Sequence, residues 1–253
     1  MSAVLHLPEV DSTNAEAMRR ALSGAPTPLW IRADRQTRGR GRSGRPWQSD
    51  HAGNLYASLL LELSCGPEVA AQLSLVTGIA VIDAIRSVGR SLSSDGPSSD
   101  NIVCELQLKW PNDILFGAAK AGGILVESTR CRGALMVVIG IGLNLIGSPA
   151  DTGRSVTSLN MHKIQADPEL MLRHVRQHMD RWLGIWQEGV GFGCCRQAWT
   201  GRATPVGTDL LINAGAGPVS GTFQGLDHDG ALMLQTGSGR QRFSFGDVTL
   251  GVP

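Results

Sequence analysis

The chain changes its pattern once, close to Gly201, and that change limits the folds open to it. Before this point, apolar strand-like runs alternate with segments whose hydrophobic residues recur every three or four positions. After it, helical periodicity is lost, and turn-forming groups rich in Gly, Asp and Asn interrupt the chain at short intervals. The sequence therefore predicts an α+β domain with a mixed β-sheet over residues 1–200, followed by a small antiparallel barrel over residues 201–253.

The clearest single element is the helix expected over residues 168–188, where Leu172, Val175, Met179, Trp182 and Trp186 share one face. Further helices are expected over 15–22 and 67–88. Strands are expected over 4–7, 28–33, 55–63, 102–108, 123–127 and 135–145, then over 209–212, 219–226, 231–235 and 241–245. Residues 34–53 have no period and predict a long loop, and residues 89–101 predict a Ser/Gly-rich linker.

Charge and cysteine usage exclude several classes of protein. The formal net charge is +1, so no global field directs the chain to nucleic acid or to a membrane. Five cysteines without a C-x-x-C pair disfavour zinc ligation and a disulfide framework. The N-terminus lacks a signal peptide pattern, and the longest apolar run, residues 134–143, is too short for a membrane span. We expect a cytoplasmic protein with no membrane partner.

Local positive charge gathers in the loop Arg38-Gly-Arg-Gly-Arg-Ser-Gly-Arg45. Its G-x-G-x-x-G spacing is not a dinucleotide fingerprint, because Pro46 and Trp47 follow and no helix opens. Guanidinium groups on a glycine-rich backbone suit phosphate, and the Trp47 ring offers a plate for a base. The pattern fits a nucleotide-phosphate clamp, and equally a solvated charged loop or a nonspecific nucleic-acid patch.

Two further segments attract attention, although each has an ordinary interpretation. Lys109-Trp-Pro-Asn-Asp113 is typical of a turn at a strand end. Lys120 comes three residues before an expected strand, with Gly122 and Gly123 permitting close passage of the backbone beside a ligand. Alone, it is equally a solvated loop lysine. His174 and His178 are four residues apart but have no carboxylate or third histidine nearby, so we assign no metal ligands.

The combination is more specific than any part, and in this order it resembles the biotin protein ligases. The motifs that carry the resemblance are Ser12-Thr-Asn14, Gln36, Gly39-Arg-Gly-Arg42, Gly44-Arg-Pro-Trp47, Lys109-Trp-Pro-Asn-Asp113, Lys120 with Gly122-Gly123-Ile-Leu-Val-Glu127, and Gly140-Ile-Gly-Leu-Asn144. The resemblance implies the class II synthetase-like biotin/lipoate ligase fold, with helices flanking a mixed sheet and an SH3-like barrel at the C-terminus.

The resemblance also implies a two-step reaction. Biotin and MgATP give biotinyl-5′-AMP and pyrophosphate, and a specific lysine of a biotin carboxyl carrier protein then takes the biotinyl group. The carrier is expected to belong to acetyl-CoA carboxylase or a related biotin-dependent carboxylase. Biotin, ATP and Mg²⁺ are the small molecules implied.

Site residues follow from matching positions in the motifs. Biotin contacts are implied for Ser12, Thr13, Asn14, Gln36, Gly39, Arg40, Lys120 and Gly123, and ATP or adenylate contacts for Arg40, Arg42, Trp47, Asn112, Lys120 and Asn144. Lys120, Arg42 and Asp113 are the expected catalytic residues. A carboxylate attacking an α-phosphate joins two anions, so fixed cations are what the reaction needs. Asp113 is a candidate to orient or deprotonate the incoming amine.

Alternatives and departures remain at this stage. A lipoate or octanoate ligase or transferase is the nearest rival, and the Arg-Gly loop ending at Trp47 argues against it. A nucleic-acid binding module is disfavoured by the charge balance and by only one Tyr and five Phe.

Some biotin protein ligases carry an N-terminal helix-turn-helix repressor domain, whereas 11 residues precede Ser12 here, so we expect no DNA binding. Both a monomer and a homodimer are consistent with the sequence. The loop at 36–46 is expected to be disordered until ligands order it.

Overall fold

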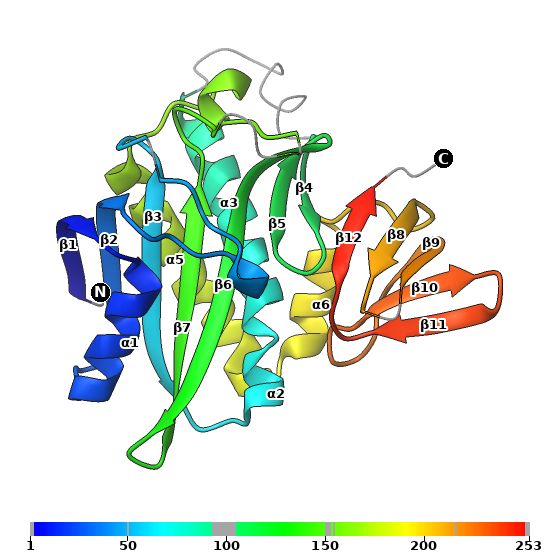
Figure 1. Cartoon of the computed structure of the whole chain (residues 1–253), viewed down its shortest axis with the longest axis horizontal. Helices are drawn as coiled ribbons and strands as arrows, with labels where there is room; N and C mark the ends of the chain where they lie inside the picture. The colour runs from blue at the N-terminus through cyan, green and yellow to red at the C-terminus, as the bar shows by residue number, and fades with distance from the viewer. Residues whose placement is uncertain are drawn as a thin grey trace.

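The computed structural model describes residues 3–49, 51–92, 105–149, 153, 155–215 and 217–250, and every structural statement below refers to these residues. Its larger part is a seven-stranded sheet (Figure 1). The strands are β1 (Ala3–Val10), β2 (Leu29–Gln36), β3 (Leu55–Leu63), β4 (Leu106–Lys109), β5 (Asp113–Phe116), β6 (Ala119–Cys131) and β7 (Ala134–Leu143). Their order is β1-β2-β3-β7-β6-β5-β4; β1 and β2 are parallel and all other neighbours antiparallel, so the sheet is mixed as predicted.

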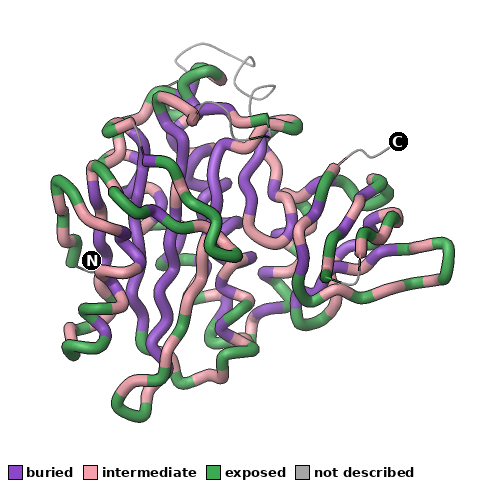
Figure 2. The backbone as a smooth tube through the Cα atoms, in the orientation of Figure 1, coloured by how far each residue is buried: buried purple, intermediate pink, exposed green. Residues whose placement is uncertain are grey.

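Helices cover both faces of this sheet (Figure 1). Helix α1 (Thr13–Ser23) packs on one face with Ile31, Leu60 and Val138. On the other face lie α3 (Leu73–Leu92), α5 (Pro168–Trp186) and α6 (Phe192–Thr200), preceded by the short α2 (Pro67–Ala70). Successive residues of a strand point to opposite faces. Both faces of β7 are therefore buried, as Figure 2 shows.

The predicted stripe on α5 is confirmed, since all five of its apolar residues are buried. They pack in the core with α3, which lies beside α5 on the same face of the sheet. The segment Pro67–Ser91 is long and apolar enough, by length and composition, to cross a membrane, but 72% of its most apolar window is buried inside the protein. Its apolar character is explained by its burial against the sheet, α5 and α6.

The N-terminus of α1 positions the first residues of the expected site, Ser12, Thr13 and Asn14. Ser12 caps the helix, with its hydroxyl oxygen 3.5 Å from the Ala15 amide that donates to it, and Gly24 ends the helix with φ +80°. The sequence predicted this helix over 15–22, and it begins two residues earlier. Ser12, Thr13 and Asn14 are consequently buried at the sheet surface.

The C-terminal part is a five-stranded antiparallel sheet, in agreement with the predicted small barrel (Figure 1). It comprises β8 (Asp209–Asn213), β9 (Pro218–Leu226), β10 (Leu232–Thr236), β11 (Gly239–Phe243) and β12 (Asp247–Leu250) in the order β11-β10-β9-β8-β12. The sequence did not predict β12, which is four residues long. The chain enters this sheet alongside β4, where Leu108 exchanges backbone hydrogen bonds with Arg202 and Thr204.

Some predicted boundaries are wrong. Residues 89–92 belong to α3 and not to the predicted linker. The rest of that linker, and the first residues of the strand predicted over 102–108, fall within 93–104, which lie outside the described residues. The strand predicted over 123–127 extends over the whole of β6. Its early part was missed because Gly122 and Gly123 look like strand-breaking residues. Helix α6 and strand β5 were not predicted.

Candidate functional site

A pocket of about 940 Å³ opens above the face of the sheet that carries α1. Its floor consists of Gly123 and Gly142, which pair across β6 and β7, with Gly140 two residues further along β7. Strand residues two apart share a face, so the glycines remove side chains from one area of that face. Every residue that the sequence analysis assigned to a ligand lines this pocket except Gly39.

One corner of the pocket is a buried hydrogen-bond network at the start of α1. The Gln36 side-chain oxygen accepts from the Thr13 amide at 2.8 Å and from the Thr13 hydroxyl at 3.1 Å. The Ser58 hydroxyl, which is fully buried on β3, lies 2.8 Å from the Thr13 hydroxyl oxygen. The sequence analysis did not identify Ser58, because a serine inside an apolar strand carries no motif. This corner offers hydroxyl and amide groups to a polar ring.

Asn14 uses its side chain inside the protein. Its amide nitrogen donates to Glu127 at 2.8 Å, and its oxygen accepts from the Ser58 hydroxyl at 2.6 Å. A Cβ at position 140 would overlap this amide, so Gly140 is required for the helix to sit against β7. These contacts indicate that Asn14 fixes the position of α1 over the sheet.

A β-bulge directs Lys120 into the pocket. Leu115 pairs with Lys120 and Ile114 with Gly122, so Ala121 is the extra residue on β6. Without the bulge, Lys120 and Gly123 would face opposite sides of the sheet. With it they share a side, and the Lys120 Nζ lies 3.2 Å from where a Cβ on Gly123 would be. The sequence analysis placed Lys120 in a loop before the strand, and this is wrong because the bulge accommodates it within β6.

Asp113 is the buried carboxylate of the pocket, with 6% of the residue exposed. Its Oδ1 pairs with the Lys120 ammonium, and its Oδ2 is 2.9 Å from the Lys109 Nζ. Burial by itself would raise the pKa of Asp113, but the two ammonium groups outweigh it and hold this pKa below its usual value. Asp113 is therefore ionised at neutral pH. Lys109 is the first residue of the Lys109-Trp-Pro-Asn-Asp113 motif, but the sequence analysis predicted no role for it.

The arginine loop forms a tight hairpin over the pocket. The Trp47 amide donates to the Gly39 carbonyl at 2.9 Å, and the Gly41 amide donates to the Arg45 carbonyl at 2.7 Å. A Cβ on Gly39 would approach the Trp47 carbonyl oxygen to 2.5 Å, so this glycine shapes the hairpin without lining the pocket. The turn itself passes through a 3₁₀ segment at Arg42–Gly44.

The arginines of the loop point to different partners. Arg40 lies 3.4 Å from Glu127, while Arg42 donates to the Asn112 side-chain oxygen at 3.1 Å and to the Gly246 carbonyl at 3.0 Å. Arg45 pairs with Asp247 of the C-terminal sheet. Arg40, Arg42 and Arg45 therefore have carboxylate or carbonyl partners within the protein. Burial lowers the pKa of Arg42, although a guanidinium stays charged in proteins.

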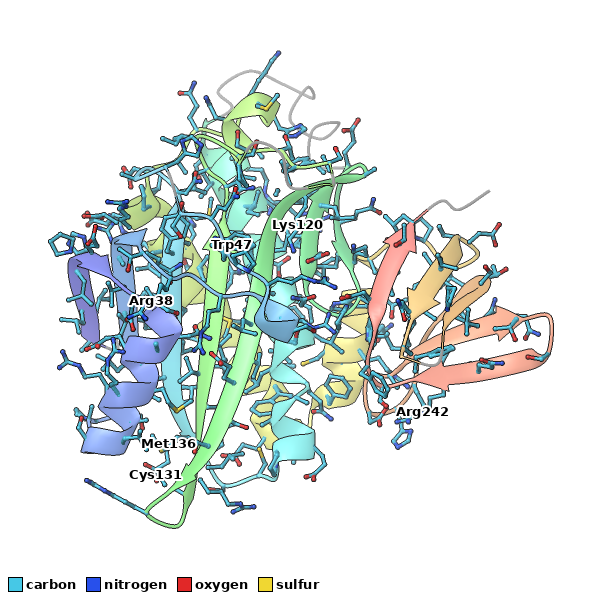
Figure 3. The ribbon with its side chains drawn as sticks, viewed as in Figure 1. Arg38, Trp47, Lys120, Cys131, Met136 and Arg242 are labelled. Carbon is cyan, nitrogen blue, oxygen red and sulfur yellow. The ribbon has the colours of Figure 1, made fainter. Side chains whose placement is uncertain are left out.

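Trp47 covers the glycine floor. A Cβ on Gly142 would come within 2.6 Å of the Trp47 ring, and one on Gly123 within 3.3 Å. The Lys120 Nζ lies 5.6 Å from the ring centroid, and the two labelled side chains are close together in Figure 3. The indole Nε1 is buried without a hydrogen-bond partner among the described residues. A ligand that lies on the floor must displace this ring, which then becomes available to pack against the ligand.

The remaining predicted residues are Asn144, which directly follows β7, and Asn112, which lies in the turn between β4 and β5. The Asn144 amide nitrogen donates to the Thr157 carbonyl at 3.0 Å, so this side chain ties β7 to the segment after it. The Asn112 side chain donates to the Ile124 carbonyl at 2.7 Å while accepting from Arg42. Asn144 therefore holds backbone in place, and Asn112 holds both backbone and the Arg42 guanidinium.

The described residues provide no evident magnesium ligand. The acidic side chains that line the pocket are Asp113 and Asp247, and both are already paired with lysine or arginine. Mg²⁺ commonly binds through substrate phosphates and water, so the donor set fits an ion that arrives with the nucleotide. Elsewhere, Asp227, His228 and Asp229 lie within ligating distance of one another, but Arg242 pairs with both carboxylates.

We predict that bound ligands protect the arginine loop from cleavage by trypsin. The side chains of Arg40 and Arg45 are about half exposed, and exposed ion pairs contribute little stability. We expect trypsin to cleave the free protein in the loop after Arg38, Arg40 or Arg42. The ligands that the sequence resemblance implies, biotin with ATP, should slow this cleavage, because phosphates give the loop stronger partners.

The control for this digestion is Arg132, which is exposed in the turn between β6 and β7, at the opposite end of these strands. Cleavage after Arg132 should be the same with and without ligands. Equal cleavage in the loop under both conditions would show that these arginines do not close over a ligand.

The fold and the pocket define a class of protein before any comparison: an α+β protein whose pocket places lysine and arginine side chains above a glycine floor. The chain matches the Biotin/lipoate A/B protein ligase family over residues 7–144 and the Biotin protein ligase C terminal domain over residues 211–251. It belongs to this family, and its whole length resembles the biotin protein ligases.

Individual relatives extend this result. A biotin–acetyl-CoA-carboxylase ligase of Paracoccus denitrificans is 37% identical, with 97% of this chain and 99% of that protein covered. The structure of the biotin protein ligase from Aquifex aeolicus in complex with biotin and ATP superposes with a TM-score of 0.79 at 25% identity, covering 99% of this chain and all of that one. The biotin protein ligase of Leishmania major in complex with biotinyl-5-AMP gives a TM-score of 0.65 at 25% identity, covering 96% and 99%.

Proposed function

We propose that the protein is an ATP-dependent ligase that activates biotin as biotinyl-5′-AMP and transfers it to a lysine of a biotin carboxyl carrier protein. The observation that carries this proposal is the position of Lys120, Arg42 and Asp113 around one glycine floor next to a buried polar corner. Relatives named as biotin ligases, over nearly the whole chain, support the same conclusion.

The polar corner favours biotin over lipoate or octanoate as the acid. The ureido ring of biotin carries both N–H donors and a carbonyl acceptor, whereas a dithiolane ring and an alkyl chain carry neither. The buried Ser12 and Thr13 and the partly buried Gln36 supply groups that match the ureido ring. A buried polar group left without a partner costs about 1–3 kcal/mol, so an apolar acid should bind this corner poorly.

In the first step, the carboxylate of biotin attacks the α-phosphate of ATP and pyrophosphate leaves. The acid is already a nucleophile, so no base is required. Repulsion between the two anions is the obstacle, and we assign Lys120 and Arg42 to offset it. Lys120 would exchange Asp113 for the reacting anions, and Asp113 would remain paired with Lys109. Mg²⁺ adds positive charge at the nucleotide phosphates.

The other assignments follow from position. Arg40 and the backbone at Gly123 would border biotin, while Trp47, Asn112 and Asn144 would border the adenylate. Gly39 would act through the shape of the loop. The carrier lysine must lose a proton before it attacks the mixed anhydride, because free lysine has a pKa of about 10.4. Asp113 is the carboxylate available in the pocket to orient that amine.

The test is to compare acids in ATP–pyrophosphate exchange. We expect biotin to support exchange, and lipoate and octanoate to support little or none at the same concentration. Exchange driven better by lipoate or octanoate would assign the protein to the other branch of the family. Exchange with none of the three would contradict the proposed first step.

A further inference from the structure

The start of β12 reaches from the C-terminal sheet into the rim of the pocket. Three consecutive residues make contacts there: the Gly246 carbonyl accepts from Arg42 at 3.0 Å, Asp247 pairs with Arg45, and the Val248 carbonyl accepts from Lys109 at 3.0 Å. Each of the three partners belongs to the first domain. Residues 246–248 therefore contact both the arginine loop and Lys109, the partner of Asp113.

The two arginines near Asp247 are held differently. Arg42 has its closest acceptors in Asn112 and the Gly246 carbonyl and lies 3.8 Å from Asp247, with 27% of its side chain exposed. Arg45 contacts the Asp247 carboxylate directly, and half of its side chain is exposed. Arg42 is thus oriented into the pocket, whereas Arg45 is turned to the C-terminal sheet.

We infer that Arg45 and Asp247 form a latch that fastens the arginine loop to the C-terminal sheet and thereby positions Arg42 for the nucleotide phosphates. This assignment rests on the proposed function, since it names Asp247 as a positioning residue of the ATP half of the site. It also separates Arg45 from the phosphate-binding arginines, a division that the repeated Arg-Gly sequence does not reveal.

The latch acts by lowering the ordering cost of the loop. A loop that is already fastened loses less conformational freedom when ATP binds, so ATP binds more tightly. The polar corner formed by Ser12, Thr13 and Gln36 depends on α1 and β2 and has no contact with Asp247 among the described residues. Loss of the latch should therefore raise the KM for ATP and leave the KM for biotin nearly unchanged.

The experiment compares Asp247→Asn with Asp209→Asn in the full chain. Asp209 is the matched control, because it is an exposed aspartate of the same sheet whose carboxylate accepts a hydrogen bond from Thr222 of that sheet. Exposed ion pairs are worth about 0.2–1 kcal/mol, so we expect Asp247→Asn to raise the KM for ATP by about 1.4-fold to fivefold. The stronger variant Asp247→Lys should raise it further, and the double variant Arg45→Glu with Asp247→Lys should restore most of the loss.

A second readout does not depend on catalysis. Trypsin cleavage within the loop of the free protein should be faster in Asp247→Asn than in wild type or Asp209→Asn. An inactive wild-type protein would contradict the proposed function and leave this readout intact. The latch is refuted if Asp247→Asn matches Asp209→Asn in cleavage rate, or if the KM for ATP does not rise, or if the charge exchange fails to restore it.

Discussion

Lys120→Ala should slow the formation of biotinyl-AMP by about 10²–10³-fold, which corresponds to about 3–4 kcal/mol of transition-state stabilisation. The bulge at Ala121 turns this ammonium over the glycine floor, where a carboxylate and an α-phosphate must meet. Removing it restores the repulsion between the two anions. The fold should survive, because Asp113 keeps its ion pair with Lys109.

The measurement is a single-turnover assay of biotinyl-AMP, with the urea midpoint as a check on folding. Lys120→Gln, which keeps a polar side chain one atom shorter and without charge, should lose about as much activity as Lys120→Ala. Lys163→Gln is the matched control, since Lys163 is an exposed lysine that is not part of the pocket. A near wild-type rate for Lys120→Ala would mean that Lys120 does not act on the reacting anions.

Asp113→Ala should destabilise the folded protein by about 3 kcal/mol, because it removes the carboxylate between two partly buried ammonium groups. Breaking one ion pair by changing a single partner leaves the other charge without compensation. This variant should therefore lose more stability than Lys120→Ala. Asp180→Ala is the control, because Asp180 is an exposed aspartate on α5 that does not line the pocket. This variant should change the free energy of unfolding little.

The stability difference should depend on pH in a defined direction. The pKa of Asp113 in the folded protein lies below its ordinary value of 3.8, so its ionised form stabilises the fold. The advantage of wild type over Asp113→Ala is complete above the unfolded pKa and is lost as the pH falls through the lower folded pKa. Urea unfolding at neutral pH and in acid checks this. Equal stability of the two proteins at neutral pH would contradict the role assigned to the ion pairs.

Local patterns predicted much of the fold. The spacing of apolar residues on α5 defined a helix and its buried face, and the β-branched run at 135–145 predicted a strand buried on both faces. The motifs also predicted which residues would gather, although the segments carrying Ser12, Arg42 and Lys120 are far apart in sequence. Each motif alone has an ordinary interpretation, and it was their order along the chain, through the resemblance to the biotin protein ligases, that assigned them to one site.

Other features depend on pairing between segments and left no local signal. The bulge that aims Lys120 exists only in the register of β5 against β6. Asp247 belongs to the site because β12 packs beside a loop about two hundred residues earlier in the chain, a contact that no periodicity encodes. Asn14 belongs to the Ser12-Thr-Asn14 motif, but its contacts with Ser58 and Glu127 depend on the packing of α1 against the sheet.

The most direct test of the proposed activity is the transfer of biotin to a purified apo carrier domain of a biotin-dependent carboxylase. The carrier should gain the mass of one biotinyl group, at its acceptor lysine, when the protein, biotin and ATP are all present. A carrier with that lysine changed to arginine should remain unmodified, and omitting ATP should abolish the reaction. A carrier that stays unmodified under the complete conditions, or gains biotin without ATP, would contradict the account.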